Sequence, residues 1–489
     1  MRLPLCVFRI PGPDFYQRPS LSPMSTTTTP PRIVIIGGGL SGTLVAVQIM
    51  RHAPQGTRIT LIERHPPIGR GVAFGSDYCC HILNVKAARM SAFPDEPDHF
   101  LNWARERAGR VGYPEQIGPD DYLPRRLYGD YIGWVFAEAR QRFKEHLTVK
   151  TVAGEAIDIE ELPQGGVRVY LEDDRSFEAD RVVLAIGNLP GEYPVRRSQR
   201  FLHGRRYVHI PWTEGVLEGI DRDDDVLLVG AGLTANDIIL QLADLGHRGV
   251  VHALSRRGLR PRAHRPYKPV NLKLDIAEIP TVRAAVRRMR EEIARATAAG
   301  DDWRAVIDAL RPHTQALWRS WSWEERGRFL RHVRPFWEVQ RHRIAPEAAQ
   351  EIDRLAAIGR VRFWAGRIVL LEETENGANV EFRRRDTGVI VGLRVAKVIN
   401  CTGPRTDYSK YQHPLLINLL ARGLIDHDPL ALGLNALPDG EVLRYRNGPT
   451  GWLFTIGAPL KGVLWESTAV PEIRQQAVIL AHRLVASGA

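Results

Sequence analysis

Two glycine-rich turns carry the clearest chemistry in this chain. The first has the spacing Gly37-x-Gly39-x-x-Gly42 and comes directly after the apolar stretch RIVII. Glycines at these positions allow a tight turn and let backbone N–H groups approach a pyrophosphate. Glu63 ends the next apolar stretch, about 20 residues further along, where a carboxylate can accept hydrogen bonds from both ribose hydroxyls of an adenosine. The pattern predicts a dinucleotide site. The expected contacts are Gly37, Gly39, Leu40, Ser41, Gly42, Glu63 and Arg64.

The second glycine turn has the spacing Gly230-x-Gly232-x-x-Ala235, with alanine in the third place. The next apolar stretch ends at Ser255, which is followed by two arginines and no acid. A carboxylate there would repel a ribose 2′-phosphate, whereas a hydroxyl and guanidinium groups bind it. The pattern favours NADPH and leaves NADH possible, since two exposed arginines after a strand are also common. The expected contacts are Gly230, Gly232, Leu233, Thr234, Ala235, Ser255, Arg256 and Arg257.

Both turns belong to a longer pattern that occurs twice. Residues 153–190 and 365–404 each open with Ala-Gly, pass through an acidic turn between alternating stretches, and close with an apolar stretch that ends at Gly187 or Gly403. Such alternation is typical of antiparallel hairpins. A chance resemblance of short strands is the alternative. The repeat predicts an α/β fold of two Rossmann-like dinucleotide-binding domains with β-meanders, plus a helical insert.

The repeat also suggests how the chain is divided. We expect a disordered extension at 1–30 and the first part of an FAD-binding domain at 31–200, because a long segment after the first turn can wrap a flavin. An NAD(P)-binding domain at 201–395 would carry the helical insert at about 270–350. Residues 396–489 would return to complete the FAD-binding domain.

Composition narrows the remaining options. The net charge is +11, but the arginines are spread along the chain with no basic block, so no nucleic-acid partner is expected. Four cysteines without a CxxC, and no apolar run long enough for a membrane span, favour a cytoplasmic protein without a metal site. The adjacent Cys79 and Cys80 are interpreted as packing residues, with a vicinal redox disulfide as the alternative.

The chain resembles the flavoproteins with two dinucleotide-binding domains, which include class B flavin monooxygenases and N-hydroxylases. More narrowly, it is similar to the bacterial FAD/NAD(P)-binding protein family, most members of which have no assigned reaction. Besides the two glycine turns, the resemblance is carried by GVAFGSDYCCHILNVKAARMSAFPDEPDHFLNWA from residue 71, LPRRLYGDYI from 123, RPHTQALW from 311, FLRHVRPFWEVQRHRIAP from 329, INCTGP from 399 and IGAPLKGVLWESTAVPEIRQQA from 456.

The resemblance implies which segments surround the flavin. His81, Asn84 and Val85 would lie in the loop nearest the flavin, within 71–91. The segment that contains Gly457, Glu466 and Thr468 would approach from the other side, with a C-terminal helix starting near Thr468 whose N-terminal N–H groups face the ring. Glu466 is interpreted either as a flavin-side group or as a surface acid at that helix N-terminus.

Two other features of the sequence each allow two interpretations. The insert holds Trp303, Trp318, Trp321, Trp323 and Trp337, which either line a pocket for a planar substrate or form the core of the insert. The stretch FLHGRRYVHIPW from residue 201 resembles the class B monooxygenase fingerprint, but its glycine-to-histidine spacing is one residue too long, which counts against Baeyer–Villiger chemistry.

These expectations together describe an FAD-dependent, NAD(P)H-oxidising monooxygenase that hydroxylates a small-molecule substrate with O2 via a flavin hydroperoxide. A flavin reductase that passes electrons to another acceptor, and a non-enzymatic flavin-binding sensor, are the alternatives. The sequence identifies no catalytic acid or base, and it leaves the substrate and the oligomeric state open.

Overall fold

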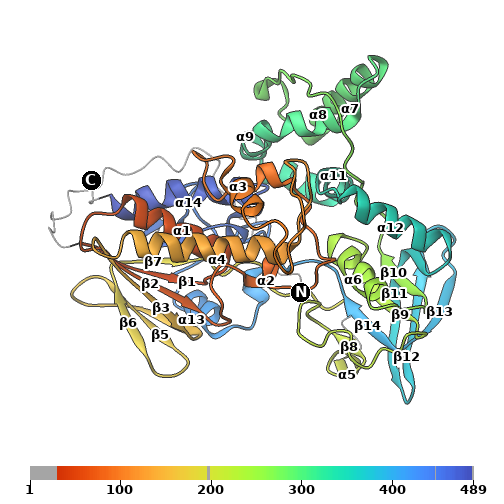
Figure 1. The fold of residues 1–489 in the computed structure, drawn as a ribbon, viewed down its shortest axis with the longest axis horizontal. Coiled ribbons are helices and arrows are strands. Elements are labelled where there is room, and N and C mark those ends of the chain that lie inside the picture. Colours follow the sequence, from red (N-terminus) through yellow and green to blue (C-terminus); the bar gives the residue numbers. More distant parts are fainter. Residues whose placement is uncertain (1–29, 195–198, 447, 487–489) are drawn as a thin grey trace, which may run out of the picture.

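The computed structural model describes residues 30–194, 199–446 and 448–486, in which two large sheets lie side by side (Figure 1) and a small three-stranded sheet packs on the first. The first sheet has the order β15-β16-β7-β1-β2-β3 and is parallel apart from the β15–β16 pair. Its strands are β1 (Arg32–Ile36), β2 (Arg58–Glu63), β3 (Thr148–Ala153), β7 (Arg181–Leu184), β15 (Glu441–Arg444) and β16 (Gly448–Thr455).

The first sheet is the middle layer of three because both of its faces are apolar. On β1, Ile33 and Ile35 face a helical layer, whereas Val34 and Ile36 face a three-stranded meander. The helices are α1 (Leu40–His52), α3 (His99–Arg105), α4 (Arg125–Arg142) and α14 (Val470–Val485), with the short α2 (Gly71–Phe74) nearby. The meander is β4 (Ala156–Glu161), β5 (Val167–Leu171) and β6 (Ser176–Ala179), and α13 (Pro414–Ala421) packs beside it.

The second sheet repeats this plan with one difference. Its order is β13-β12-β11-β10-β9-β14-β8. The strands are β8 (Tyr207–Val208), β9 (Val226–Val229), β10 (Val251–Ser255), β11 (Val361–Thr374), β12 (Gly377–Arg384), β13 (Ile390–Val395) and β14 (Lys397–Asn400). The 14-residue β11 pairs in parallel with β10 up to Ala365, and then pairs antiparallel with β12 from Gly366. One strand therefore joins the nucleotide-binding sheet to its meander. Helix α6 (Leu233–Asp244) and α12 (Pro346–Ala357) share the core on one side.

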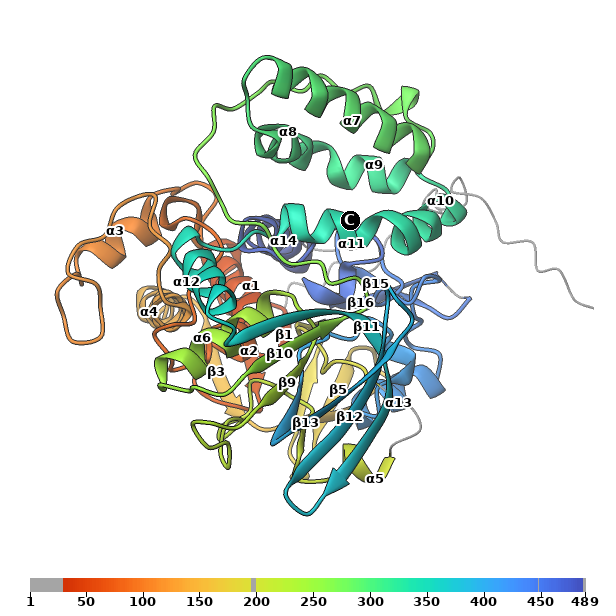
Figure 2. The same ribbon diagram turned by 90° about the vertical axis from the view of Figure 1, so that its right-hand side faces the viewer.

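A run of helices without a strand lies between β10 and β11 in the part of the chain that the structure describes. Figure 2 shows α7, α8 and α9 as a layer above α11. The helices are α7 (Val282–Ala298), α8 (Trp303–Leu310), α9 (Thr314–Ser320), α10 (Trp323–Arg328) and α11 (Arg334–Arg341). Trp318, Trp321 and Trp337 are buried in the core of this insert, and Trp303 and Trp323 are half-buried. The interpretation of these tryptophans as mainly core residues is confirmed.

The chain crosses between the sheets at two neighbouring places. After β7 it leaves the first sheet towards the short helix α5 (Gln199–Leu202), and after β14 it returns. The two crossings run side by side, because Leu189 and Arg405 form an antiparallel bridge. The returning chain then adds β16 in parallel beside β7, and α14 packs on α1 (Figure 1). The C-terminal segment therefore completes the first sheet and its helical layer.

Candidate functional site

The first glycine turn, residues 37–42, is a place where backbone packs on backbone. Gly37 has φ of +105°, and a Cβ atom there would lie 2.3 Å from the carbonyl oxygen of Ala185. A Cβ atom at Gly42 would lie 1.8 Å from the carbonyl oxygen of Gly37. Side chains are therefore excluded at both positions, and α1 starts directly against the end of β1. Gly39 is the N-cap of α1, with no side chain capping the helix, so N–H groups of the first turn are left for an anionic ligand.

Glu63, at the end of β2, lies against this turn. Its Oε2 accepts a hydrogen bond of 2.7 Å from the N–H of Gly38, and its Oε1 accepts one of 2.8 Å from the N–H of His65. The carboxylate is therefore held beside the glycines, where the sequence predicts it. The neighbouring Arg64 points elsewhere and forms an ion pair of 3.2 Å with Glu155.

Two further predicted glycines border the first turn or its neighbouring strand. Gly457 follows β16, and a Cβ atom there would lie 2.9 Å from Oγ of Ser41 in the first turn of α1. The N–H of Gly457 donates to Oε1 of Gln476 on α14 at 3.0 Å. Gly187 follows β7 with φ of +65°, and its carbonyl accepts a hydrogen bond from the hydroxyl of Tyr408 at 3.1 Å. The C-terminal segment thus reaches the first turn.

The loop at 71–91 lies between the two halves of the molecule. His81 is 2% exposed, and its Nδ1 lies 2.6 Å from Oγ of Ser76. Burial lowers the pKa of His81 to about 4, so this imidazole is neutral at neutral pH. The carbonyl of Asn84 accepts a hydrogen bond of 3.0 Å from Nε2 of His264, across the boundary between the sheets. Val85 is half-buried against the first core.

The two adjacent cysteines of this loop are free thiols. Cys79 is exposed, while Cys80 packs against the core of the second sheet. Burial raises the pKa of the Cys80 thiol to about 11, so the thiolate needed for redox exchange is disfavoured. This geometry agrees with packing, and the vicinal disulfide is not formed.

The second glycine turn, residues 230–235, repeats the close contact. Gly230 has φ of +129°, and a Cβ atom there would lie 2.2 Å from the carbonyl oxygen of Cys401 at the end of β14. Gly232 is the N-cap of α6, and a Cβ atom there would meet nothing within 4 Å among the described residues. Leu233 and Thr234 are half-buried and Ala235 is fully buried. The space above Gly232 fits the close approach of a pyrophosphate.

The polar residues after β10 lie at the same end of the sheet as this turn. Oγ of Ser255 accepts a hydrogen bond of 3.0 Å from the N–H of Gly258. Arg256 is exposed, and Arg257 makes a long hydrogen bond of 3.4 Å to the carbonyl of Arg331. Both guanidinium groups are weakly engaged. Gly403, with φ of +85°, comes after β14 at this end.

The C-terminal helix begins later than predicted. The sequence places its start near Thr468, but α14 begins at Val470 with Ala469 as N-cap. Pro471 stands in the first turn, where proline is well tolerated because its missing N–H has no helical acceptor to lose. Thr468 is exposed and lies before the helix.

Glu466 is not a surface acid, so that interpretation is wrong. It is 9% exposed and has φ of +65°. Its Oε1 accepts a hydrogen bond of 2.9 Å from Nε1 of Trp337, and its Oε2 accepts one of 3.0 Å from Nε of Arg341. Both donors lie on α11, so packing of the insert takes this carboxylate out of solvent.

Sequence analysis did not predict an ion pair that joins α4 of the first half to α6 of the second. Arg125, in the first turn of α4, lies 3.0 Å from the carboxylate of Asp237 on α6. Burial raises the pKa of Asp237 to about 6, and the neighbouring Arg125 opposes this rise. Sequence analysis noted the stretch LPRRLYGDYI, which contains Arg125, for its family resemblance only and assigned it no function. The pair fixes the start of the second turn's helix to the helical layer of the first sheet.

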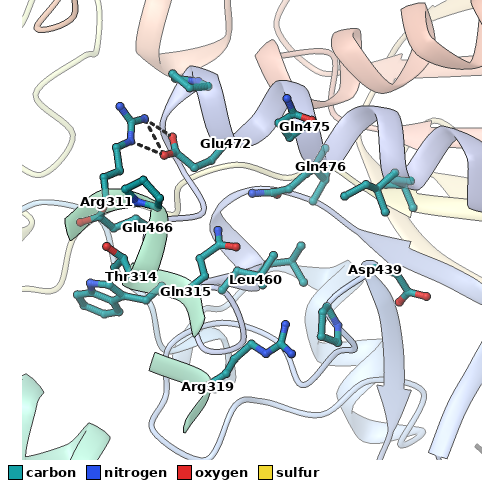
Figure 3. Close-up of a pocket in the computed structure, with 18 of the residues that line it drawn as sticks. Arg311, Thr314, Gln315, Arg319, Asp439, Leu460, Glu466, Glu472, Gln475 and Gln476 are labelled. Carbon is teal, nitrogen blue, oxygen red and sulfur yellow. Dashed lines mark hydrogen bonds and ion pairs between the residues drawn. The ribbon is translucent and has the colours of Figure 1, made fainter. Parts of the chain in front are cut away.

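A cavity of about 510 Å³ that the sequence did not predict lies between the insert and α14 (Figure 3). Arg311 and Glu472 form a bidentate ion pair at its rim, with distances of 2.6–2.8 Å. Leu460 and Trp465 are among its apolar lining, and Arg319 and Gln315 face it. Of the predicted site residues, Glu466 alone is among the described residues that line it.

Two features are absent from the described residues. They contain no group of three or more His, Cys, Asp or Glu side chains arranged to hold a metal ion. None of the helices in this part of the chain is long and apolar enough to span a membrane.

Residues 34–189 match a family model described as FAD-NAD(P)-binding. This confirms the expected relationship to FAD/NAD(P)-binding flavoproteins for that segment. The chain is 30% identical to an L-aspartate N-monooxygenase (nitrosuccinate-forming) of Streptomyces davaonensis, over 44% of this chain and 39% of that protein. It is 26% identical to a nitrosuccinic acid synthase of Aspergillus oryzae, over 33% of this chain and 27% of that protein. The matches thus span well under two thirds of these relatives.

Solved structures share the whole fold. An L-lysine 6-monooxygenase from Pseudomonas syringae superposes with a TM-score of 0.62 at 16% identity, covering 93% of this chain and 99% of that one. An ornithine N-hydroxylase from Kutzneria sp. 744, solved with reduced FAD, NADP+ and L-ornithine, gives 0.58 at 15% identity, with 93% and 99% covered. The predicted fold, two Rossmann-type nucleotide-binding units, is confirmed.

The position of Glu63 leads to a first test. Replacing it by lysine (Glu63→Lys) puts an ammonium beside the first glycine turn and removes the acceptor for ribose hydroxyls. We expect the purified variant to lack bound flavin, measured as the ratio of visible flavin absorbance to protein. Glu145→Lys, an exposed acid away from the turn, is the control with the same charge change and should keep its flavin. Full flavin content in Glu63→Lys would contradict the assignment.

The open space at Gly232 leads to a second test. Gly232→Ala adds a methyl group that meets no described protein atom, so the fold should be kept while a pyrophosphate is held away. We expect the Kd for NADPH to rise about tenfold or more, which is about 1.4 kcal/mol, in a direct titration. Gly392→Ala on β13 also meets open space and should leave NADPH binding unchanged. Equal Kd values in the two variants would count against a dinucleotide at this turn.

Proposed function

We propose that this protein is an FAD-dependent, NADPH-oxidising monooxygenase that acts on a small molecule. The observation that carries the proposal is the presence of two glycine turns of the same construction, fixed relative to each other by the Arg125–Asp237 pair and the paired crossings. The flavoprotein family match at 34–189 and the N-monooxygenase relatives support the same conclusion.

We assign the two cofactors from the side chains beside each turn. FAD is proposed at the first turn, because Glu63 lies on it and the C-terminal segment reaches it at Gly457. NADPH is proposed at the second, because β10 ends with the hydroxyl of Ser255 and is followed by two weakly engaged guanidinium groups and no carboxylate. The boundary expected at 396 falls before β14, which pairs with β9 in the second sheet, so on this assignment the NADPH-binding unit comprises 201–400. The FAD-binding unit then comprises 31–200 and the segment after β14. The weak engagement of Arg256 and Arg257 leaves both free to turn towards a 2′-phosphate.

The residues of the chain would position these groups and exclude water from them. Bound FAD supplies the redox chemistry, accepting hydride from NADPH and activating O2. Neutral, buried His81 and the loop around it would cover the space between the two turns. The N–H groups in the first turn of α14 would favour negative charge on the reduced ring. No acid–base dyad is required of the protein, which agrees with the lack of one in the sequence.

The relatives indicate the kind of atom that receives the oxygen. The names of the aspartate N-monooxygenase and the ornithine N-hydroxylase specify nitrogen as the acceptor. Two further neighbours are named as monooxygenases of L-lysine and, in a structure from Erwinia amylovora solved with FAD, of cadaverine. We therefore propose an amine nitrogen as acceptor. The balanced reaction converts R–NH2, O2, NADPH and H+ to R–NHOH, NADP+ and H2O. Because Cys79, Cys80 and Cys401 are free thiols, the cytoplasm is the proposed compartment.

The nicotinamide assignment can be tested through the two arginines. In the double variant Arg256→Ala/Arg257→Ala, we expect the Kd for NADPH to rise about tenfold or more while the Kd for NADH changes little, because charge-assisted bonds to the 2′-phosphate are lost. Both constants are measured by titration of the flavoprotein. The control Arg283→Ala/Arg287→Ala removes two exposed arginines from α7. An equal loss for both nucleotides would overturn the NADPH assignment.

The oxygenase reaction is tested with L-aspartate, L-ornithine, L-lysine and cadaverine. We expect one of them to accelerate NADPH oxidation in air, and one atom of 18O from 18O2 to enter the product, measured by mass spectrometry. A flavin reductase would instead oxidise NADPH equally fast with a dye under anaerobic conditions and would give a product free of 18O. Bound flavin that fails to bleach with NADPH would favour a sensor.

A further inference from the structure

The segment from Gly457 to Ser467 is held on two sides. On one side, Gln476 of α14 accepts from the N–H of Gly457 and donates to the carbonyl of Ser467 at 3.1 Å. On the other side, Nε1 of Trp318 donates to the carbonyl of Gly462 at 2.8 Å, and the rings of Trp318 and Trp465 stack. The segment is therefore a rigid strip between the proposed flavin site and the helices of the insert.

Charged groups concentrate where α11 crosses this strip. Each carboxylate there already has an arginine. Arg334 and Glu338 lie 2.7 Å apart, Arg341 and Glu466 lie 3.0 Å apart, and Arg311 holds Glu472 in a bidentate pair. All three acids are thus neutralised within the protein.

Lys461 is the cation left over in this group. Among the described residues no acceptor lies within hydrogen-bond distance of its Nζ, and no carboxylate lies within ion-pair distance. Its Nζ lies 5.2 Å from the centre of the Trp465 ring, a cation–π contact that replaces only part of its hydration. The side chain as a whole is half-buried.

The surroundings of this ammonium favour the binding of an anionic group. Burial, and to a smaller extent the nearby Arg334, lowers the pKa of Lys461 to about 8, although Glu338 and Glu466 oppose the shift. Burial also lowers the pKa of the neighbouring His342 to about 4, so that imidazole is neutral. A desolvated charge without a partner is costly, and an anionic ligand group removes that cost.

We propose that Lys461 binds a carboxylate group of the substrate, so that the substrate is an amino acid and not a carboxylate-free amine. This inference rests on the proposed function, because it takes the bound amino acid to be the substrate of the proposed monooxygenase. Lys461 lies four residues after Gly457, which contacts the first glycine turn. A carboxylate held at Lys461 therefore anchors one end of a small amino acid at the strip that borders the flavin site.

The test measures binding to the oxidised FAD-containing protein without NADPH, by calorimetry or by fluorescence of the stacked tryptophans. L-aspartate, L-ornithine and L-lysine are the probes, and cadaverine is L-lysine without its carboxylate. We expect at least one of the three amino acids to bind. If L-lysine binds, it should bind more tightly than cadaverine. Lys461→Met should weaken the binding of the amino acid about tenfold or more. Arg319→Met, a cation that faces the neighbouring cavity, is the matched control and should bind normally.

A conservative variant and pH separate charge recognition from a structural role. The groups that face Lys461 are Arg334 and Glu338 on α11, His342 at its end, and Glu466 on the strip itself. Because the ammonium loses its proton above about pH 8, wild-type affinity should fall as the pH rises through that value. Lys461→Arg should keep the binding and lose this pH dependence, since arginine stays protonated. Thermal unfolding checks that each variant folds.

Three results would overturn the proposal. They are no binding by any of the amino acids, equal binding in wild type and Lys461→Met, and a loss in Arg319→Met in place of Lys461→Met. These outcomes are independent of oxygen transfer. A protein that binds an amino acid through Lys461 but gives no 18O product would refute the monooxygenase proposal and leave the carboxylate site standing.

Discussion

The direct contact of backbone on backbone at the two glycine turns is the constraint on which the rest of the structure depends. In the first turn the helix starts so close to the strand that a single Cβ atom at Gly42 would overlap the carbonyl of Gly37. In the second, the same closeness is set by Gly230 against Cys401, and Ala235 takes the third place without a clash. This proximity orients the helix N-terminus towards the ends of the strands, where phosphates bind through backbone N–H groups. Glu63, Gly187 and Gly457 are arranged around the first of these ends, and Ser255 and Gly403 lie at the second.

The proposed assignment of FAD to the first turn and NADPH to the second depends on the residues beside each turn. The first turn has a carboxylate on it and receives the returning C-terminal segment. The second has open space over Gly232 and basic side chains after β10. Between them stand the buried neutral His81 and the Arg125–Asp237 ion pair. Two glycine turns of the same construction are thereby surrounded by different charges.

Sequence reasoning worked where the signal is local. The glycine spacings, the alternating meanders and the acid after β2 are each contained in a short window, and the structure has all of them. It failed where the decisive contact joins distant segments. Nothing in the stretch around Glu466 shows that Trp337 and Arg341 will cover it, so the sequence left a surface position open for an acid that is buried and bonded. The Arg125–Asp237 pair and the position of Lys461 beside acids that already have arginines were missed for the same reason, because pairing is a property of packing. The start of α14 was misplaced by two residues because Pro471 was not used as a first-turn signal.

The insert lies within the second half of the chain but packs on the first. Its core includes Trp465 and Leu432 from the returning segment, and Arg311 and Arg341 are bonded to acids of that segment. Separating the halves would expose stacked indole rings and leave the buried Glu466 and the half-buried Glu472 without their cations, which is costly. The molecule is therefore expected to denature as a single cooperative unit, and neither half is suited to an independent existence. Any rotation of the two large sheets against each other must therefore take place about the helical insert, which is packed on the C-terminal segment of the first half.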